Sequence, residues 1–192
     1  MLFRSTRSPA AAAEAVRCRR CEGEGFTAAR ACGPYEGALR AAVLSLKREP
    51  HVGRRVAGLL SAARARPPLD AAEVVVPVPL HPSRERERGF NQAALLARSL
   101  AKGSGLGLDE CSLVRVGQAA RHRAGMDRRA RRETVEGVFR VARPRLVEGR
   151  RVLLVDDVFT TGATASACAA ALRGAGASEV YVLTLARAGG RG

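Results

Sequence analysis

The chain has 192 residues, a length that favours one domain with a short additional segment. Apolar residues make up 46% and charged residues 27% of the chain, a balance that excludes an intrinsically disordered protein. The formal charge of +15 favours partners rich in phosphate, such as nucleotides, nucleic acid or anionic lipid, although an aromatic share of 4% weakens the case for a protein that stacks single-stranded bases on aromatic side chains.

In chain order, residues 1–17 are irregular, and residues 18–34 carry three cysteines and several glycines. The apolar spacing between Tyr35 and Arg66 predicts two helices that are separated near Pro50. Their apolar faces are expected to carry Leu39, Val43, Leu44, Leu46, Val56, Leu59 and Leu60. Residues 74–76 then predict a short buried strand stopped by prolines, and residues 91–102 predict a helix with Asn91 as its N-cap.

The second half of the chain has a regular alternation. Residues 121–132 are the most basic stretch, in which six arginines oppose a single acid, and residues 138–141 predict a strand. The apolar run at 152–155 predicts a parallel strand covered on both faces, and residues 164–174 and 180–185 predict a helix and a further strand. Strand, helix and strand at this spacing form a βαβ unit, which predicts an α/β fold with a parallel sheet.

The cysteines and the apolar runs predict a compartment. No apolar run approaches the roughly 18 residues that a membrane span needs, and no secretory signal peptide is recognisable, so we expect a cytoplasmic protein. Five cysteines form no paired framework, which favours reduced thiols: Cys18, Cys21, Cys32, Cys111 and Cys168.

The segment from Val152 to Thr164 carries the clearest chemical pattern. A buried strand ends in Asp156 and Asp157, a loop with threonine hydroxyls and Gly162 follows, and then a helix begins. Ligands of open α/β sheets bind at the carboxyl ends of the strands, and the first N–H groups of a helix have no intrahelical partner. This loop is therefore expected to cradle a phosphate group.

The two acids need a different contact, because a phosphate would repel them. Vicinal sugar hydroxyls or a hydrated Mg²⁺ suit paired carboxylates, so a ribose 5-phosphate group would satisfy both halves of the pattern. The alternative is that Asp156 and Asp157 only cap the following helix and face solvent. The loop is not a Walker loop, because no lysine follows its glycine.

Residues 152–164 resemble the motif with which type I phosphoribosyltransferases bind phosphoribosyl diphosphate (PRPP). Residues 35–47, residues 76–92 and the basic stretch leading to Phe139 resemble the ComF family, phosphoribosyltransferase-like proteins linked to competence for DNA uptake. The resemblance implies an open, mostly parallel sheet flanked by helices, with a short cysteine-containing N-terminal segment. We therefore expect that segment at residues 1–34 and a phosphoribosyltransferase-like domain at residues 35–192.

The resemblance also implies roles for individual residues. Asp156 and Asp157 would act as catalytic acids that contact the ribose hydroxyls and, through water, Mg²⁺. The loop at 77–81 would meet pyrophosphate. Arg84, Arg86 and Arg88, which are also expected on a loop, could neutralise it, although a solvated basic face is the alternative for these arginines. The stretch 121–132 would match the loop that closes over PRPP. The residues expected to bind PRPP are Thr160, Thr161, Gly162, Ala163, Thr164, Val78, Pro79, Arg88 and Arg131.

ComF relatives often carry a zinc site built from two C-x-x-C pairs. In this chain Cys18 and Cys21 match one pair, and Cys32 has no neighbouring cysteine. A structural zinc site uses four ligands, so zinc is expected only as a possible cofactor of an incomplete site formed by these three cysteines.

Two functions are compatible with the resemblance. The first is a phosphoribosyltransferase-fold protein that binds PRPP or another nucleotide containing ribose 5-phosphate with Mg²⁺ and serves DNA uptake, with single-stranded DNA and competence proteins as partners. The second is an Mg²⁺-dependent phosphoribosyltransferase of nucleotide metabolism, a glycosyltransferase with an unknown acceptor base. Purine-salvage relatives carry a further acid just after the acid pair, where this chain has Phe159 and Thr160, so purine salvage is not expected.

Overall fold

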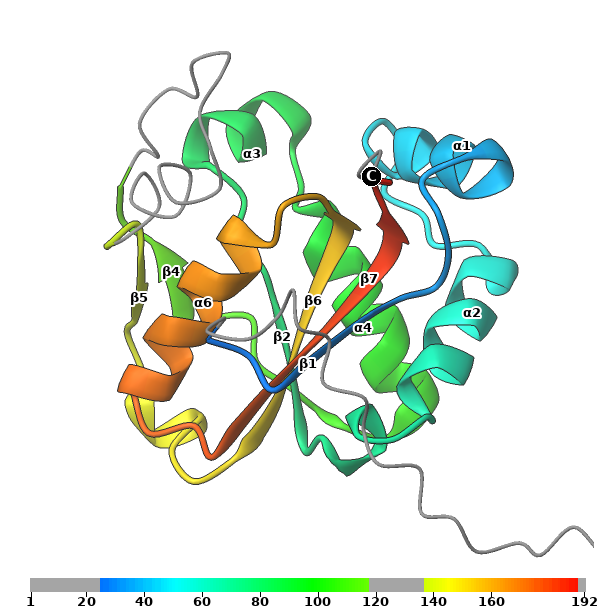
Figure 1. Cartoon of the computed structure of the whole chain (residues 1–192). Helices are drawn as coiled ribbons and strands as arrows, with labels where there is room; N and C mark the ends of the chain where they lie inside the picture. The colour runs from blue at the N-terminus through cyan, green and yellow to red at the C-terminus, as the bar shows by residue number, and fades with distance from the viewer. Residues whose placement is uncertain (1–24, 118–136, 190–192) are drawn as a thin grey trace, which may run out of the picture.

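A strand with apolar residues on both sides forms the centre of the fold. Strand β6 (Arg151–Phe159) is the middle strand of a five-stranded sheet with the order β1-β7-β6-β2-β3 (Figure 1). The computed structural model describes residues 25–117 and 137–189. All pairings in this sheet are parallel, which confirms the predicted α/β fold; the other strands are β1 (Ala28–Ala31), β2 (Val74–Pro77), β3 (Gly107–Leu108) and β7 (Glu179–Arg187).

Helices cover both faces of the sheet, and the alternation of side chains along β6 serves both layers. Val152 and Leu154 pack in a cluster with α6 (Ala163–Gly174). Leu153 and Val155 pack in a second cluster with three helices on the other face: α1 (Gly37–Leu46), α2 (Arg54–Arg64) and α4 (Gln92–Ser104). The central strand is therefore held from both sides, which sets the position of its carboxyl end.

A small antiparallel sheet lies against α6. It consists of β4 (Leu113–Arg115) and β5 (Phe139–Val141), and both strands contact the helix. Leu113 and Phe139 are buried in the same cluster as Cys168 and Leu172 of α6. The basic stretch at 121–132 falls in the sequence between these two strands and lies outside the described residues.

Helix α3 (Pro82–Arg88) corrects one expectation, because the arginines at 84–88 were expected on a loop. His81 begins the helix, its Nδ1 accepting the N–H of Ser83 at 3.2 Å, and Gly89 ends it with a φ of 81°. None of the residues in α3 is buried. A helix without an apolar face has no apolar periodicity, so the pattern that predicted the other helices could not detect it.

The other helices and strands that the sequence predicted are present, with shifts at single residues, whereas the strands β1, β3 and β4 were not predicted. Asn91 is the N-cap of α4, and its Oδ1 accepts the N–H of Ala93 at 2.9 Å. Leu59, expected on a buried face, is 43% exposed, whereas Leu60 is fully buried. Strand β6 continues past the predicted end at residue 155, so the acid pair lies within the strand. The described residues also contain two short 3-10 helices, η2 (Leu69–Ala71) and η3 (Pro144–Leu146).

The described part of the expected N-terminal segment joins the sheet. Residues 28–31 form β1, which pairs with residues 181–184 of β7 as an edge strand. The division of the chain at residue 34 stays a prediction. Among the helices of residues 25–117 and 137–189, none has the length and apolar character needed to cross a bilayer.

Leu154→Ala is expected to lower the free energy of unfolding by about 3 kcal/mol, because it leaves a cavity between β6 and α6. Urea denaturation followed by circular dichroism measures this loss. The control is Leu59→Ala on the exposed side of α2, with an expected loss below about 1 kcal/mol. Equal losses in the two variants would contradict the two-sided burial of β6.

Candidate functional site

The carboxyl end of β6 leads into a short loop, residues 160–162, and then into the first turn of α6. Gly162 is the N-cap of α6 with a φ of 85°, and no side chain caps this helix end. The hydroxyl of Thr161 accepts the N–H of Ala163 at a long 3.4 Å. The first-turn N–H groups of a helix lack intrahelical partners and carry the positive end of the helix dipole, so the turn is suited to a phosphate group.

The structure brings all of the sequence-predicted cradle residues together on this loop and turn. Thr160 is exposed, and the side chains of Thr161 and Thr164 are partly accessible, whereas Gly162 and Ala163 are buried. The three hydroxyls and the backbone of one helical turn therefore occupy a single segment of the chain, at the centre of the sheet edge.

Gly162 is required by its surroundings as well as by its backbone conformation. A Cβ at this position would lie 2.9 Å from the ring of Phe159. The ring of Phe159 also meets Phe26 edge-on, with centroids 6.1 Å apart, and the guanidinium of Arg187 lies 6.0 Å from its centroid. Phe159 thus supports the loop from the core, a role that the sequence did not reveal.

The surroundings of Asp156 disfavour its charged form. Its Oδ1 accepts the backbone N–H of Asp157 at 2.8 Å. Burial raises the pKa of the Asp156 carboxyl well above its usual range, and the neighbouring charge of Asp157 raises it further. A ligand that donates hydrogen bonds or brings positive charge to this carboxylate would relieve both effects.

Asp157 is the meeting point of several elements. Its carboxylate is nearly buried, and its Oδ2 lies 3.4 Å from Nζ of Lys47, which follows α1, and 3.3 Å from Nε2 of Gln92 on α4. Arg88, at the end of α3, donates a hydrogen bond to Oε1 of Gln92. Arg88 is therefore connected to the acid pair through Gln92, and its predicted contact with pyrophosphate stays a prediction.

The loop after β2 is tied to the site by its backbone. Val78 is buried; its N–H donates to the carbonyl of Val155 at 2.9 Å, and its carbonyl accepts Nδ2 of Asn91 at 3.0 Å. These bonds hold the loop beside β6. The contacts with PRPP that the sequence assigned to Val78 and Pro79 stay predictions.

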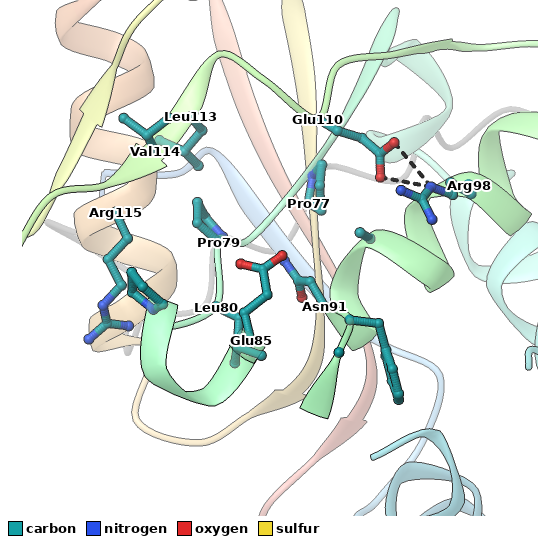
Figure 2. A pocket seen from close by; sticks show the side chains of 14 residues that line it. Pro77, Pro79, Leu80, Glu85, Asn91, Arg98, Glu110, Leu113, Val114 and Arg115 are labelled. Atoms are coloured by element: carbon teal, nitrogen blue, oxygen red, sulfur yellow. Dashed lines mark hydrogen bonds and ion pairs between the residues drawn. The ribbon is translucent and has the colours of Figure 1, made fainter. Parts of the chain in front are cut away.

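A cavity of about 460 Å³ lies next to this loop, between α3, α4 and β4. Figure 2 shows Arg98 of α4 paired with Glu110 on one side, at 3.0 Å, and Arg115 of β4 on the other. Pro79 lines the cavity, but neither the acid pair nor the loop at 160–164 does. The cavity is therefore a neighbour of the cradle and separate from it.

The zinc candidates are only partly described. Cys18 and Cys21, like Arg131 from the PRPP-binding set, lie outside the described residues. Cys32 is half-buried against the apolar cluster of α1, α2 and α4, and burial raises the pKa of its thiol to about 11. In residues 25–117 and 137–189, no three side chains of His, Cys, Asp or Glu gather in a way that could hold a metal ion. A zinc site stays a prediction.

The carboxylates of Asp156 and Asp157 could bind Mg²⁺ only together with a phosphorylated ligand. Asp156 and Asp157 supply hard oxygen donors, but both are already engaged by protein groups. Mg²⁺ commonly binds through one or two carboxylates together with substrate phosphates and water. The acid pair fits that mode, in which a phosphorylated ligand completes the coordination.

Sequence reasoning gave no role to Lys47 or Gln92. Gln92 ends the stretch 76–92 that resembles the ComF family, but no local spacing indicated its contact with Arg88, because Arg88 ends α3 and Gln92 begins α4. Lys47 ends the stretch 35–47 that resembles the ComF family, but no local pattern indicated its contact with Asp157, because only the packing of α1 against the sheet brings it there.

The sequence pattern of the phosphoribosyl transferase domain matches residues 86–192. Competence protein F of Haemophilus influenzae is 36% identical over 124 residues, which are 62% of this chain and 52% of that protein. The DNA utilization protein YhgH of Salmonella typhimurium is 36% identical over 125 residues, 65% of this chain and 54% of that protein. Competence protein ComFC of Bacillus subtilis is 36% identical over 115 residues, which are 59% of this chain and 44% of that protein. The chain thus spans about half the length of the curated relatives it matches.

Two solved structures show similar folds. A glutamine PRPP amidotransferase from Bacillus subtilis, complexed with ADP and GMP, is 22% identical with a TM-score of 0.45, over 74% of this chain and 30% of that chain. A hypoxanthine phosphoribosyltransferase from Staphylococcus aureus is 17% identical with a TM-score of 0.44, over 69% and 62%. With TM-scores below 0.5, neither likeness adds support to a function.

Gly162→Ala is expected to lower the free energy of unfolding by about 2 kcal/mol, since a side chain is strained at positive φ and the methyl group would meet the Phe159 ring. Chemical denaturation measures the change. Gly174→Ala, at the last residue of the same helix, is the control, because nothing lies within 4 Å of its Cβ position. If Gly162→Ala were as stable as the control, the described loop geometry would be wrong.

Proposed function

The chain belongs to the phosphoribosyl transferase domain family, with competence proteins of the ComF type among its relatives, and we propose that it binds the ribose 5-phosphate group of PRPP or a related nucleotide together with Mg²⁺. The observation that carries this proposal is that two suitable groups lie together after one strand, β6. The first turn of α6, which begins after a left-handed glycine, follows a pair of carboxylates, and burial raises the pKa of one of them, Asp156.

The division of labour follows from charge. The 5-phosphate would accept hydrogen bonds from the first turn of α6 and from the hydroxyls of Thr160, Thr161 and Thr164. The ribose hydroxyls would donate to Asp156 and Asp157, which relieves the unfavourable burial of Asp156. Mg²⁺ would neutralise the diphosphate of PRPP when both are bound.

A second candidate, transfer of the phosphoribosyl group to an acceptor base, is favoured by the presence of both acids. A phosphate cradle alone does not need Asp156 and Asp157, whereas a carboxylate stabilises the positive charge that develops on ribose as diphosphate leaves. Release of pyrophosphate from PRPP in the presence of nucleobases, measured by a coupled colour assay, separates a transferase from a binding protein.

PRPP with Mg²⁺ is expected to bind with a dissociation constant between about 1 µM and 1 mM, and Asp156→Asn combined with Asp157→Asn is expected to abolish binding, because the amides no longer accept from the ribose hydroxyls with the strength of a charge. Isothermal titration calorimetry measures both.

Asp70→Asn, at an exposed acid in η2, is the matched control and is expected to bind as the wild type does. The proposal fails if the wild type gives no binding heat, or if the double variant binds as tightly as the wild type.

The relatives' names connect those proteins with competence and with DNA utilization. We propose the same connection for this chain, with single-stranded DNA and competence proteins as partners. Exposed arginines support it: Arg84 and Arg86 lie on α3, a helix with no buried residue, where they alternate with Glu85 and Glu87.

Single-stranded DNA is expected to bind at low salt and to lose affinity by about a hundredfold between 50 and 200 mM salt, the fall produced by about five neutralised phosphates. Fluorescence anisotropy with a labelled oligonucleotide measures it. Arg84→Gln with Arg86→Gln is expected to weaken binding and to reduce the salt slope by about 1.4, because each phosphate contact with a single strand contributes about 0.7. Arg54→Gln with Arg55→Gln on the exposed side of α2 is the matched control. No complex at about 100 µM protein in low salt would exclude this role.

A further inference from the structure

Lys47 is the cation that meets the acid pair. Its Nζ lies 3.4 Å from Oδ2 of Asp157, and the side chain of Lys47 is 35% exposed while that of Asp157 is 10% exposed. The ammonium group therefore lies between a nearly buried carboxylate and solvent. Lysine is rare in this chain, which has 33 basic residues but only two lysines, Lys47 and Lys102.

The position of Lys47 is set by packing. Helix α1, which Lys47 follows, contacts β7, and Val43 and Leu46 of this helix are buried in the cluster that also holds Val155 of β6. Two buried side chains within the last turn anchor this end of the helix. The packing of α1 in the core thus brings Lys47 to Asp157 and fixes the position of its ammonium group.

The charge of the acid pair opposes the binding of an anionic ligand, and Lys47 lies where it can offset that charge. Two adjacent carboxylates attract cations and repel anions, yet the proposed ligand carries several negative charges. One positive charge a few ångströms away attracts an anionic ligand and repels a cationic one. It strengthens the binding of an anion and weakens the binding of a free divalent cation.

We propose that Lys47 sets the charge balance of this site, so that a pair of acids accepts a phosphorylated sugar and does not collect divalent cations in its absence. This inference rests on the proposed function, because it concerns the same site. Lys47 is a positioning and charge-balancing residue and takes no part in bond making.

The test compares Lys47→Met, Lys47→Arg and the control Lys102→Met, at the exposed second lysine on α4. Two probes are titrated separately into the full chain: ribose 5-phosphate in metal-free buffer, by calorimetry, and Mn²⁺ alone, by electron paramagnetic resonance. Lys47→Met is expected to bind ribose 5-phosphate about tenfold more weakly and Mn²⁺ about threefold or more tightly. Lys47→Arg keeps the charge and is expected to stay near the wild type in both.

The opposite signs separate charge balance from a structural role. A variant that had lost only its local structure would bind both probes more weakly, and that result would overturn the inference, as would unchanged binding of both. Urea denaturation of each variant checks that it is folded.

The outcome for the proposed function is read independently. If the wild type binds no ribose 5-phosphate, the proposed function is wrong, and the Mn²⁺ comparison still decides the inference: tighter Mn²⁺ binding by Lys47→Met supports it, and equal binding overturns it.

Discussion

The burial of β6 on both faces is the constraint on which the rest of the structure depends. Its apolar residues pack against α6 on one side and against α1, α2 and α4 on the other, and this packing fixes the position of the strand. Its carboxyl end therefore emerges at a fixed place in the sheet. Three features of the candidate site follow that end: the acids at 156–157, the loop at 160–162 and the first turn of α6.

The same burial creates the electrostatic character of the site. A carboxylate at the end of a covered strand has lost much of its water, which raises the pKa of Asp156 and leaves Asp157 in need of donors. The fold supplies those donors from distant elements, namely Lys47 after α1 and Gln92 on α4. An acid pair prepared in this way is suited to sugar hydroxyls, because they donate hydrogen bonds without adding charge.

The local elements could be read from the sequence because each has a local cause. The run at 152–155 indicated a covered strand, Asn91 indicated a helix start, and the alternation of strand and helix indicated a parallel sheet. Helix α3 escaped detection because it buries nothing, and Leu59 was misplaced because apolar spacing alone does not say which side of a helix meets the core. Residues 160–164 could be singled out as one segment because they are consecutive, and their contact with a phosphate stays a prediction.

By itself the sequence determined most of the helices and strands and placed residues 160–164 and the acid pair together at the end of one strand, because these depend on neighbouring residues and on the elementary geometry of strands and helices. Only the tertiary structure decided what surrounds them. The packing of Phe159 against Gly162 and the convergence of Lys47 and Gln92 on Asp157 join residues far apart in the chain. Such contacts arise from the burial of helix faces against the sheet, and no local pattern encodes which side chains that burial will bring together.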